Sequence, residues 1–293
     1  MEIINRRKRM MSIARKLRRA ENLTIGFVPT MGALHEGHLS LIHEARAMCD
    51  VVVVSVFVNP AQFGPAEDFN SYPRDLTRDS ALLAEYNVNY VFAPTVEEIY
   101  PSDFSTYVTV EGLSDQLEGV SRPEHFRGVT TVVAILLNIV KPDFAFFGQK
   151  DAQQAILIKR MVRDLAFSAE IVVVPIVREQ SGLAMSSRNN YLDEGQRRAA
   201  PVLSRALSKA HLAYEEGEHN AARLVEIVRA TIEREPLARI DYVSVNDADT
   251  LEKLEKIDDR PALVSLAVFI GSTRLIDNVV LGATKKNVVS ANA

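Results

Sequence analysis

The sequence predicts an α/β fold, with a doubly wound parallel sheet domain followed by a smaller α+β domain. Up to about residue 177, short apolar runs rich in β-branched residues alternate with segments of helical periodicity. Beyond that point two long, charged helical segments come first and strand-like runs follow them. We therefore expect one domain over residues 1–176 and a smaller one over residues 177–293.

The first domain opens with a strand, a helix and a second strand. Ile25–Val28 and Val51–Val58 are nearly continuous apolar runs, as are the interior strands of parallel sheets. His35–Met48 lies between them and has the pattern of a helix. This order is a βαβ unit, which predicts a right-handed crossover and a Rossmann-like sheet.

The same alternation continues through the first domain. We expect further helices at residues 73–86, 128–140 and 152–165, and further strands at residues 90–93, 144–147 and 170–177. Thr106–Val110 is expected as another strand, near an edge of the sheet.

The second domain begins with helices and ends with strands. The expected helices cover residues 194–216 and 221–235, and the expected strands cover residues 240–245, 262–270 and 274–280. We expect these strands to form an antiparallel sheet. Lys285–Ala293 is polar and small, as in a frayed tail.

The composition excludes several classes of protein. The chain has 293 residues, 47% of them hydrophobic, and a net charge of −4, which gives no support for binding to nucleic acid. The single cysteine, Cys49, excludes an intrachain disulfide framework and favours a reducing, cytoplasmic location. No run of apolar residues is long enough to predict a membrane span.

The segment from Arg6 to Arg19 is strongly basic and lacks the apolar core of a secretory signal. A nucleic-acid arm and a membrane-surface helix are two alternatives. We favour a surface helix that packs an apolar side on the body of the domain, since charged helix faces are usually solvated. That apolar side would consist of Met11, Ile13, Ala14 and Leu17.

The candidate site is predicted by the loops that follow the expected strands. In an open α/β sheet, ligands bind beyond the carboxyl ends of the strands. Four loops at such ends are rich in polar or glycine residues, and we expect them to face one crevice: 29–38, 59–64, 148–151 and 178–188.

The first of these loops carries two histidines, His35 and His38, at the start of a helix. A helix N-terminus attracts anions, Gly32 and Gly37 permit a close approach of the backbone, and imidazoles can donate hydrogen bonds to a phosphate. Helix capping and solvent exposure are the alternatives for these histidines. A metal site lacks a third ligand nearby in the sequence. Together with the preceding strand, the pattern favours nucleotide binding.

Three further groups of residues fit such a site. Lys150 follows a strand end and a glycine, where a cation can reach a phosphate, while Asp151 is either a helix cap or a ligand. Met185–Arg188 offers two hydroxyls and a guanidinium, which suit a mobile clamp on a triphosphate. Gln62 and Gln154 can both donate and accept hydrogen bonds, which suits a hydroxy-acid substrate.

Together these segments closely resemble the pantothenate synthetase (pantoate–β-alanine ligase) family of the HxGH nucleotidyltransferase superfamily. HxGH marks only the superfamily, whereas Asn-Pro-x-Gln-Phe at residues 59–63 and Ser-Ser-Arg-Asn at residues 186–189 are far more specific. The matches follow the family's order and spacing over about residues 22–282 and also include residues 27–38, 72–75, 125–129 and 147–151.

The resemblance implies a reaction in two steps. ATP and pantoate would form pantoyl adenylate and pyrophosphate, and β-alanine would then attack the adenylate to release AMP and pantothenate. The family assigns His38 as a proton donor, whereas we expect His38 and His35, with Lys150, to stabilise charge on the transferring phosphates. Asp75 is expected to contact residues that line the site rather than the substrates themselves.

The resemblance also implies the binding residues. Gln62 would contact pantoate and β-alanine, and Gln154 would hold pantoate. The ATP site would be lined by Met31, Gly32, Ala33, Leu34, His35, Glu36, Gly37, His38, Gly148, Gln149, Lys150, Asp151, Val177, Met185, Ser186, Ser187 and Arg188.

Mg²⁺ is implied as the counterion of ATP, bound mostly through phosphates and water, with no protein ligand assigned. A homodimer is expected, and the second domain is expected to act as a lid. Two alternative functions remain at this point: another HxGH nucleotidyltransferase acting on a small acid or phosphate, and a non-catalytic nucleotide-binding regulator.

Overall fold

The computed structural model describes residues 1–65, 67, 69–70 and 72–282, so the expected tail at Lys285–Ala293 lies outside the described residues. The chain divides into two compact units. The first comprises Met1–Gln149 and Gln153–Val177, and the second comprises Lys150–Ala152 with the described residues from Arg178 onward.

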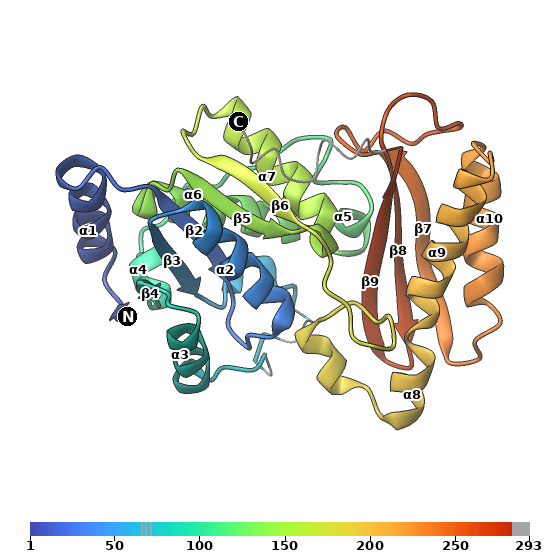
Figure 1. Cartoon of the computed structure of the whole chain (residues 1–293), viewed down its shortest axis with the longest axis horizontal. Coiled ribbons are helices and arrows are strands. Elements are labelled where there is room, and N and C mark those ends of the chain that lie inside the picture. Colours follow the sequence, from blue (N-terminus) through green and yellow to red (C-terminus); the bar gives the residue numbers. More distant parts are fainter. Residues whose placement is uncertain (66, 68, 71, 283–293) are drawn as a thin grey trace. The chain divides into compact units, whose positions relative to one another are not determined.

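A parallel sheet forms the centre of the first unit, in the strand order β1-β4-β3-β2-β5-β6 (Figure 1). Neighbouring strands of this sheet run parallel. Its strands are β1 (Glu2–Ile4), β2 (Ile25–Thr30), β3 (Val51–Val56), β4 (Tyr90–Phe92), β5 (Phe144–Gly148) and β6 (Glu170–Val174). The predicted fold class is thereby confirmed for this part of the chain.

The order in which the chain adds strands to the sheet changes side between the neighbouring strands β2 and β5. From β2 the chain adds β3 and β4 on one side, and β5 and β6 follow on the other. This is the topological switch point at which ligands of open α/β sheets bind. The loop with the two histidines leaves β2 and the loop with Gly148 leaves β5, so both start at this point.

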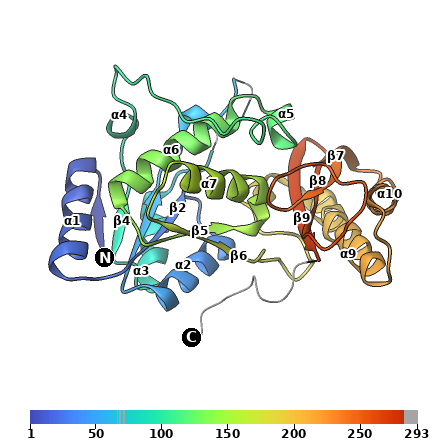
Figure 2. The same cartoon turned by 90° about the horizontal axis from the view of Figure 1, so that it is seen from above.

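Helices cover both faces of the sheet. Figure 2 shows α2 and α3 on one face and α6 and α7 on the other. The side chains of α2 and α3 share a buried cluster with the strands, which includes Leu39, Ile42, Val52, Val54 and Leu83. The helices of this region are α1 (Arg7–Ala20), α2 (Glu36–Met48), α3 (Leu76–Glu85), α4 (Val96–Ile99), α5 (Glu118–Ser121), α6 (His125–Val140) and α7 (Ala152–Asp164).

The basic N-terminal segment is a helix, α1, that buries Met10, Ala14 and Leu17. The expected apolar side was wrong in one member, because Met11 is 37% exposed and Met10 takes the buried position.

The expected strand at Thr106–Val110 was wrong, because these residues form no strand. The backbone of Val108 is instead held by side chains of α6: its N–H donates to Thr131 Oγ1 at 2.9 Å, and its carbonyl accepts from Thr130 Oγ1 at 2.6 Å. Two threonines therefore satisfy the polar groups that a neighbouring strand would have paired.

The second unit contains an antiparallel sheet, β7-β8-β9, as expected. Its strands are β7 (Ala238–Asp247), β8 (Ala262–Ile270) and β9 (Thr273–Leu281), and its helices are α8 (Glu194–Ala199), α9 (Val202–Glu215) and α10 (Ala221–Ile232). The single helix expected at residues 194–216 is two helices, because the chain breaks at Ala200–Pro201, where proline lacks the N–H of a continuing helix. The helices α9 and α10 lie against the sheet (Figure 1). Their side chains and those of the strands form one buried core.

Candidate functional site

The loop after β2 is held by a buried carboxylate. Gly32 and Ala33 have φ angles of +84° and +52°, so the chain turns sharply at the end of the strand. The N–H groups of Ala33 and Leu34 donate to the two carboxylate oxygens of Asp79 on α3, each at 2.9 Å. Asp79 is only 1% exposed, and a Cβ at Gly32 would lie 2.9 Å from its Oδ2. The shape of the loop is therefore fixed from α3.

Asp79 was not predicted from the sequence, which had suggested Asp75 as a supporting residue. Asp75 is the N-cap of α3, where its side chain accepts the N–H of Arg78 at 2.9 Å. Asp79 lies one turn further along the helix. An aspartate on the buried side of an amphipathic helix is a signal that could have identified it, since buried carboxylates need partners.

The two histidines lie together at the start of α2. His35 is the N-cap, and its Nδ1 accepts the N–H of Gly37 at 3.1 Å. The capping alternative for His35 is thereby confirmed, and a neutral His35 ring then carries its proton on Nε2. The His38 ring stacks on it, with centroids 4.1 Å apart and planes inclined by 38°. The two rings form one unit rather than two independent groups.

Gln62 is held next to the histidine loop. Its Nε2 lies 3.2 Å from the sulfur of Met31, and its Oε1 accepts from Asn59 Nδ2 at 3.0 Å. Asn59 is 1% exposed and also donates to the carbonyl of Gly128 at 3.1 Å and accepts from Tyr100 at 2.8 Å. Burial raises the pKa of Tyr100, so its hydroxyl stays a donor. Asn59 was not assigned a role from the sequence and proves to orient Gln62.

The segment carrying Gln62 lies directly on the first turns of α6. A Cβ on Gly128 would be 2.1 Å from the carbonyl oxygen of Ala61 and 2.6 Å from the nitrogen of Gln62. Only glycine permits this approach of the short 3₁₀ helix Pro60–Gln62 to α6.

His125 ties the same segment to the loop before α6. Its Nδ1 lies 2.8 Å from the carbonyl of Gln62, and its Nε2 lies 3.1 Å from Nη1 of Arg122. Because Arg122 can only donate, Nε2 accepts and Nδ1 donates, which is a neutral imidazole. Burial, with the nearby Arg122 charge, lowers the pKa of His125 to about 4. Arg122 in turn forms a two-pronged ion pair with Glu67, at 2.8 and 2.7 Å.

At the end of β5, Gly148 has open space where a side chain would lie, because among the described residues none but its chain neighbours comes within 4 Å of that place. Gln154 is partly buried in the first turn of α7, which follows that strand. Its neighbour Gln153 is 6% exposed and structural, since it accepts from the N–H of Glu118 and donates to the carbonyls of Leu113 and Gln116.

The remaining predicted residues lie at the boundary of the units or in the second unit. Gln149 and Val177 end the two segments of the first unit, and both are partly buried. The Lys150 ammonium lies 3.7 Å from Asp151 Oδ2, with side chains 21% and 49% exposed. Met185 and Ser187 are partly buried, and Ser186 caps a short 3₁₀ helix by accepting the N–H of Arg188 at 3.3 Å.

Thus the first unit brings together Met31, His35, His38 and Gln62, with Gly148 at the neighbouring strand end. The second unit holds Lys150 and the 185–188 segment. The expectation of a single crevice formed by all four loops stays a prediction.

The described part of the chain contains no cluster of three or more histidine, cysteine, aspartate or glutamate residues that could hold a metal ion. Of its helices, none combines the length and the apolar character needed to cross a membrane.

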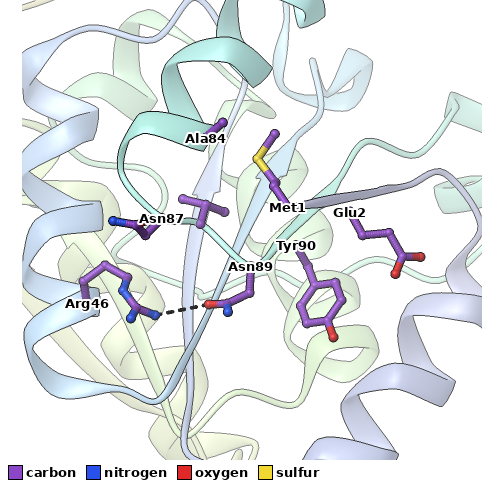
Figure 3. Close-up of a pocket in the computed structure, with 8 residues that line it drawn as sticks. Met1, Glu2, Arg46, Ala84, Asn87, Asn89 and Tyr90 are labelled. Carbon is purple, nitrogen blue, oxygen red and sulfur yellow. Dashed lines mark hydrogen bonds between the residues drawn. The ribbon is translucent and has the colours of Figure 1, made fainter.

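A surface hollow of about 630 Å³ is lined by residues that include Glu2, Arg46 and Asn89 (Figure 3). It includes Glu2, Asn89 and Tyr90 at the amino ends of β1 and β4, whereas the histidine loop follows a carboxyl end. Its Arg46 donates to the side chain of Asn89 at 3.2 Å. This position is opposite to the edge at which ligands of such sheets bind.

Comparison with known proteins agrees with the geometry. The family model described as pantoate-beta-alanine ligase matches residues 2–280. The chain is 59% identical over 264 residues to the pantothenate synthetase of Pelotomaculum thermopropionicum, covering 90% of this chain and 93% of that protein. It is 60% identical over 267 residues to the pantothenate synthetase of Moorella thermoacetica, with the same coverage.

Solved structures give the same result. The structure of pantothenate synthetase from Thermus thermophilus has a TM-score of 0.89 and 45% identity, covering 95% of this chain and 99% of that one. A pantoate-beta-alanine ligase from Francisella tularensis, complexed with beta-gamma ATP and beta-alanine, has a TM-score of 0.79 and 37% identity, covering 97% of this chain and 98% of that one.

Proposed function

Because the chain belongs to the pantoate-beta-alanine ligase family, we propose that it joins pantoate to β-alanine in a reaction that converts ATP to AMP and pyrophosphate. The observation that carries the proposal is the contact of Gln62 with Met31, 3.2 Å from nitrogen to sulfur. It joins the loop suited to an acid substrate to the loop suited to a nucleotide. The ATP and β-alanine named for the Francisella structure support the same substrates.

The chemistry follows from the poor reactivity of a carboxylate. In the first step a carboxylate oxygen of pantoate attacks the α-phosphorus of ATP, and the bond to pyrophosphate breaks. In the second step the amine of β-alanine attacks the carbonyl carbon, loses a proton, and AMP leaves with the carboxylate oxygen. Negative charge develops on the transferring phosphates in the first step, where positioned donors lower the barrier.

The histidine pair suits this task. With Nδ1 accepting from Gly37, a neutral His35 directs its single N–H donor from Nε2. His38 stacks on that ring and presents a second imidazole to the same place. We assign both to stabilising the phosphate charge, and Lys150 to the same role.

The residues proposed to bind the acid and the amine are also held in place by their neighbours. Gln62 is fixed by Asn59 and by the backbone contact of His125 with Gln62, so its amide is oriented before substrate arrives. We assign Gln62 to pantoate and β-alanine, and Gln154 to pantoate. Met31–His38, Gly148–Asp151, Val177 and Met185–Arg188 are assigned to ATP.

The proposal includes Mg²⁺ as part of the nucleotide substrate. We assign the ion mainly to phosphate oxygens and water. Mg²⁺ would supply positive charge to the departing pyrophosphate. The protein's own donors, His35, His38 and Lys150, act on the remaining phosphate oxygens.

We further propose that the protein is a homodimer, that it works in the cytoplasm, and that the second unit serves as a lid. Family membership supports the dimer, and light scattering on the purified protein tests it. A single cysteine, buried at Cys49, supports the reducing location.

One assay tests the proposed activity. The purified protein is incubated with ATP, Mg²⁺, pantoate and β-alanine, and AMP and pantothenate are measured. Equal amounts of both are expected. A stable adenylylated product would favour another HxGH nucleotidyltransferase, and absence of any turnover with intact ATP binding would favour a regulator.

A further inference from the structure

Two neighbouring residues of β9, Asp277 and Asn278, each hold a segment to which the proposed function assigns ATP phosphates. Asp277 is 2% exposed and Asn278 is 4% exposed. A polar side chain in such a place destabilises the fold unless its hydrogen bonds are made. The partners of the two side chains therefore indicate what they do.

Asp277 fixes the start of the 178–188 segment. Nη1 and Nη2 of Arg178 donate to its two carboxylate oxygens at 2.6 and 2.9 Å. Arg178 also donates to the carbonyl of Gly182 at 3.1 Å and pairs with Ala184 in an antiparallel bridge. A two-pronged pair of this kind sets orientation as well as distance. The residue just before Met185 is thus tied to β9.

The other end of the same segment is also fixed. Asn189 is 3% exposed, and its Nδ2 donates to the carbonyl of Ala184 at 3.1 Å and to Glu179 at 3.0 Å. Met185–Arg188 therefore starts and ends at anchored positions. The anchor that reaches the sheet is Asp277.

Asn278 fixes Lys150. Its Nδ2 donates to the backbone carbonyl of Lys150 at 2.9 Å. The bond acts on the main chain and leaves the ammonium group of Lys150 for other partners. It sets the point from which the lysine side chain extends.

The strand serves both segments because successive side chains point to opposite faces. Asp277 shares a face with Leu275 and Leu281, which belong to the core packed by the helices. Asn278 lies on the other face. Two neighbouring residues of β9 thus fix the main chain at Lys150 and at the start of the 185–188 segment.

We propose that Asp277 and Asn278 are positioning residues for the adenylation step, acting through Arg178 and Lys150 on the groups that meet the ATP phosphates. This inference rests on the proposed function. It predicts that loss of either side chain slows the transfer to the α-phosphorus and spares the attack of β-alanine on pantoyl adenylate, which involves no pyrophosphate.

The first test compares Asn278→Ala with Asn246→Ala. Asn246 is a matched control: it lies in the same unit, is 3% exposed, and donates Nδ2 to the carbonyl of Leu251 at 2.7 Å. Both variants should lower Tm by similar amounts. Only Asn278→Ala should slow single-turnover pyrophosphate release, by about tenfold, the value of one hydrogen bond. Pantothenate formation from added pantoyl adenylate should be unchanged in both.

Two further variants keep the test decisive if Asn278→Ala folds poorly. Asn278→Asp keeps the shape but turns the donor into an acceptor facing the Lys150 carbonyl, and it should slow the first step at least as much. Asp277→Asn weakens the Arg178 pair and should raise the KM for ATP, again without an effect on the second step.

A double-mutant cycle then asks through which group Asn278 acts. If it works through Lys150, the double variant Asn278→Ala/Lys150→Ala should be no slower than Lys150→Ala alone. Equal slowing of both half-reactions by Asn278→Ala, an effect matching that of Asn246→Ala, or additive losses in the cycle would each overturn the inference. If the unmodified protein makes no pantothenate even from pantoyl adenylate, the proposed function fails and the inference fails with it.

Discussion

The imidazole rings of His35 and His38 stack with centroids 4.1 Å apart, and the Nδ1 of His35 is occupied as the cap of α2. His35 therefore has a structural role besides the chemical role proposed for it. The two roles can be separated by substitution, because asparagine also caps helices well but lacks the imidazole ring.

We predict that His38→Ala lowers the single-turnover rate of adenylate formation by about 10²–10³, as expected for loss of a donor to developing charge. His35→Asn should lower the same rate while leaving Tm nearly unchanged, whereas His35→Ala should also lose about 1 kcal/mol of stability with its cap. Rapid-quench kinetics and thermal unfolding measure the two effects. An unchanged rate in His38→Ala would contradict its role.

Asp79 provides a second prediction. Asp79→Ala removes the acceptor of two buried N–H groups, those of Ala33 and Leu34, and should cost about 3 kcal/mol of unfolding free energy and raise the KM for ATP. Asp75→Ala is the matched control. It removes only the cap of α3 and should cost about 1 kcal/mol with normal kinetics. Equal kinetic effects in both variants would show that Asp79 does not shape the loop after β2.

Gly128→Ala should separate α6 from the segment that carries Gln62. The added methyl would lie 2.1 Å from the carbonyl oxygen of Ala61, so one backbone must move. We expect a loss of about 3 kcal/mol of stability and a rise in the KM for pantoate. Urea unfolding and steady-state kinetics measure both. A stable variant with normal pantoate kinetics would contradict the packing described for Gln62.

Gly148→Ala should change ATP binding without a loss of stability, in contrast to Gly128→Ala. Apart from its chain neighbours, no described residue lies within 4 Å of a Cβ at this position, so stability should stay within about 0.5 kcal/mol. If ATP approaches the backbone there, as proposed, the methyl should raise the KM for ATP. Unchanged ATP kinetics would remove Gly148 from the nucleotide site.

The neutral His125 predicts a dependence of stability on pH. Its pKa is lowered to about 4, mainly by burial, from an unfolded value near 6.5. Between these values the unfolded chain binds a proton that the folded chain does not, so stability falls as pH is lowered through this window. The loss should reach at most about 3 kcal/mol. Unfolding of the protein and of His125→Gln from pH 7 to pH 4 measures it, and the variant should lack this contribution.

Most of the architecture could be predicted from the sequence, because long apolar strands and amphipathic helices carry strong periodic signals. Strands were expected at residues 25–28 and 51–58, and the structure has them at Ile25–Thr30 and Val51–Val56. The short elements were not predicted, because β1 has only three residues and α4 only four, too few to show a periodic pattern. The error at Thr106–Val110 arose because two threonines of a distant helix satisfy its backbone, a contact that no local pattern shows.

Candidate site residues could be predicted from the sequence where a motif marks them, and residues that only support another residue could not. His35, His38 and Gln62 stand in recognisable segments. Asp79, Asn59 and His125 act on backbone groups or on other side chains, which only the folded chain brings together. Lys150 illustrates the same limit, because its anchor, Asn278, lies far along the chain.

The central claim is that the acid is activated as an acyl adenylate, and the fate of one oxygen tests it most directly. Pantoate labelled with ¹⁸O in its carboxylate is converted with ATP, Mg²⁺ and β-alanine, and the products are examined by mass spectrometry. We predict that each AMP carries one ¹⁸O from pantoate and that pantothenate retains the other. Label in inorganic phosphate, with ADP as the nucleotide product, would contradict the adenylate route.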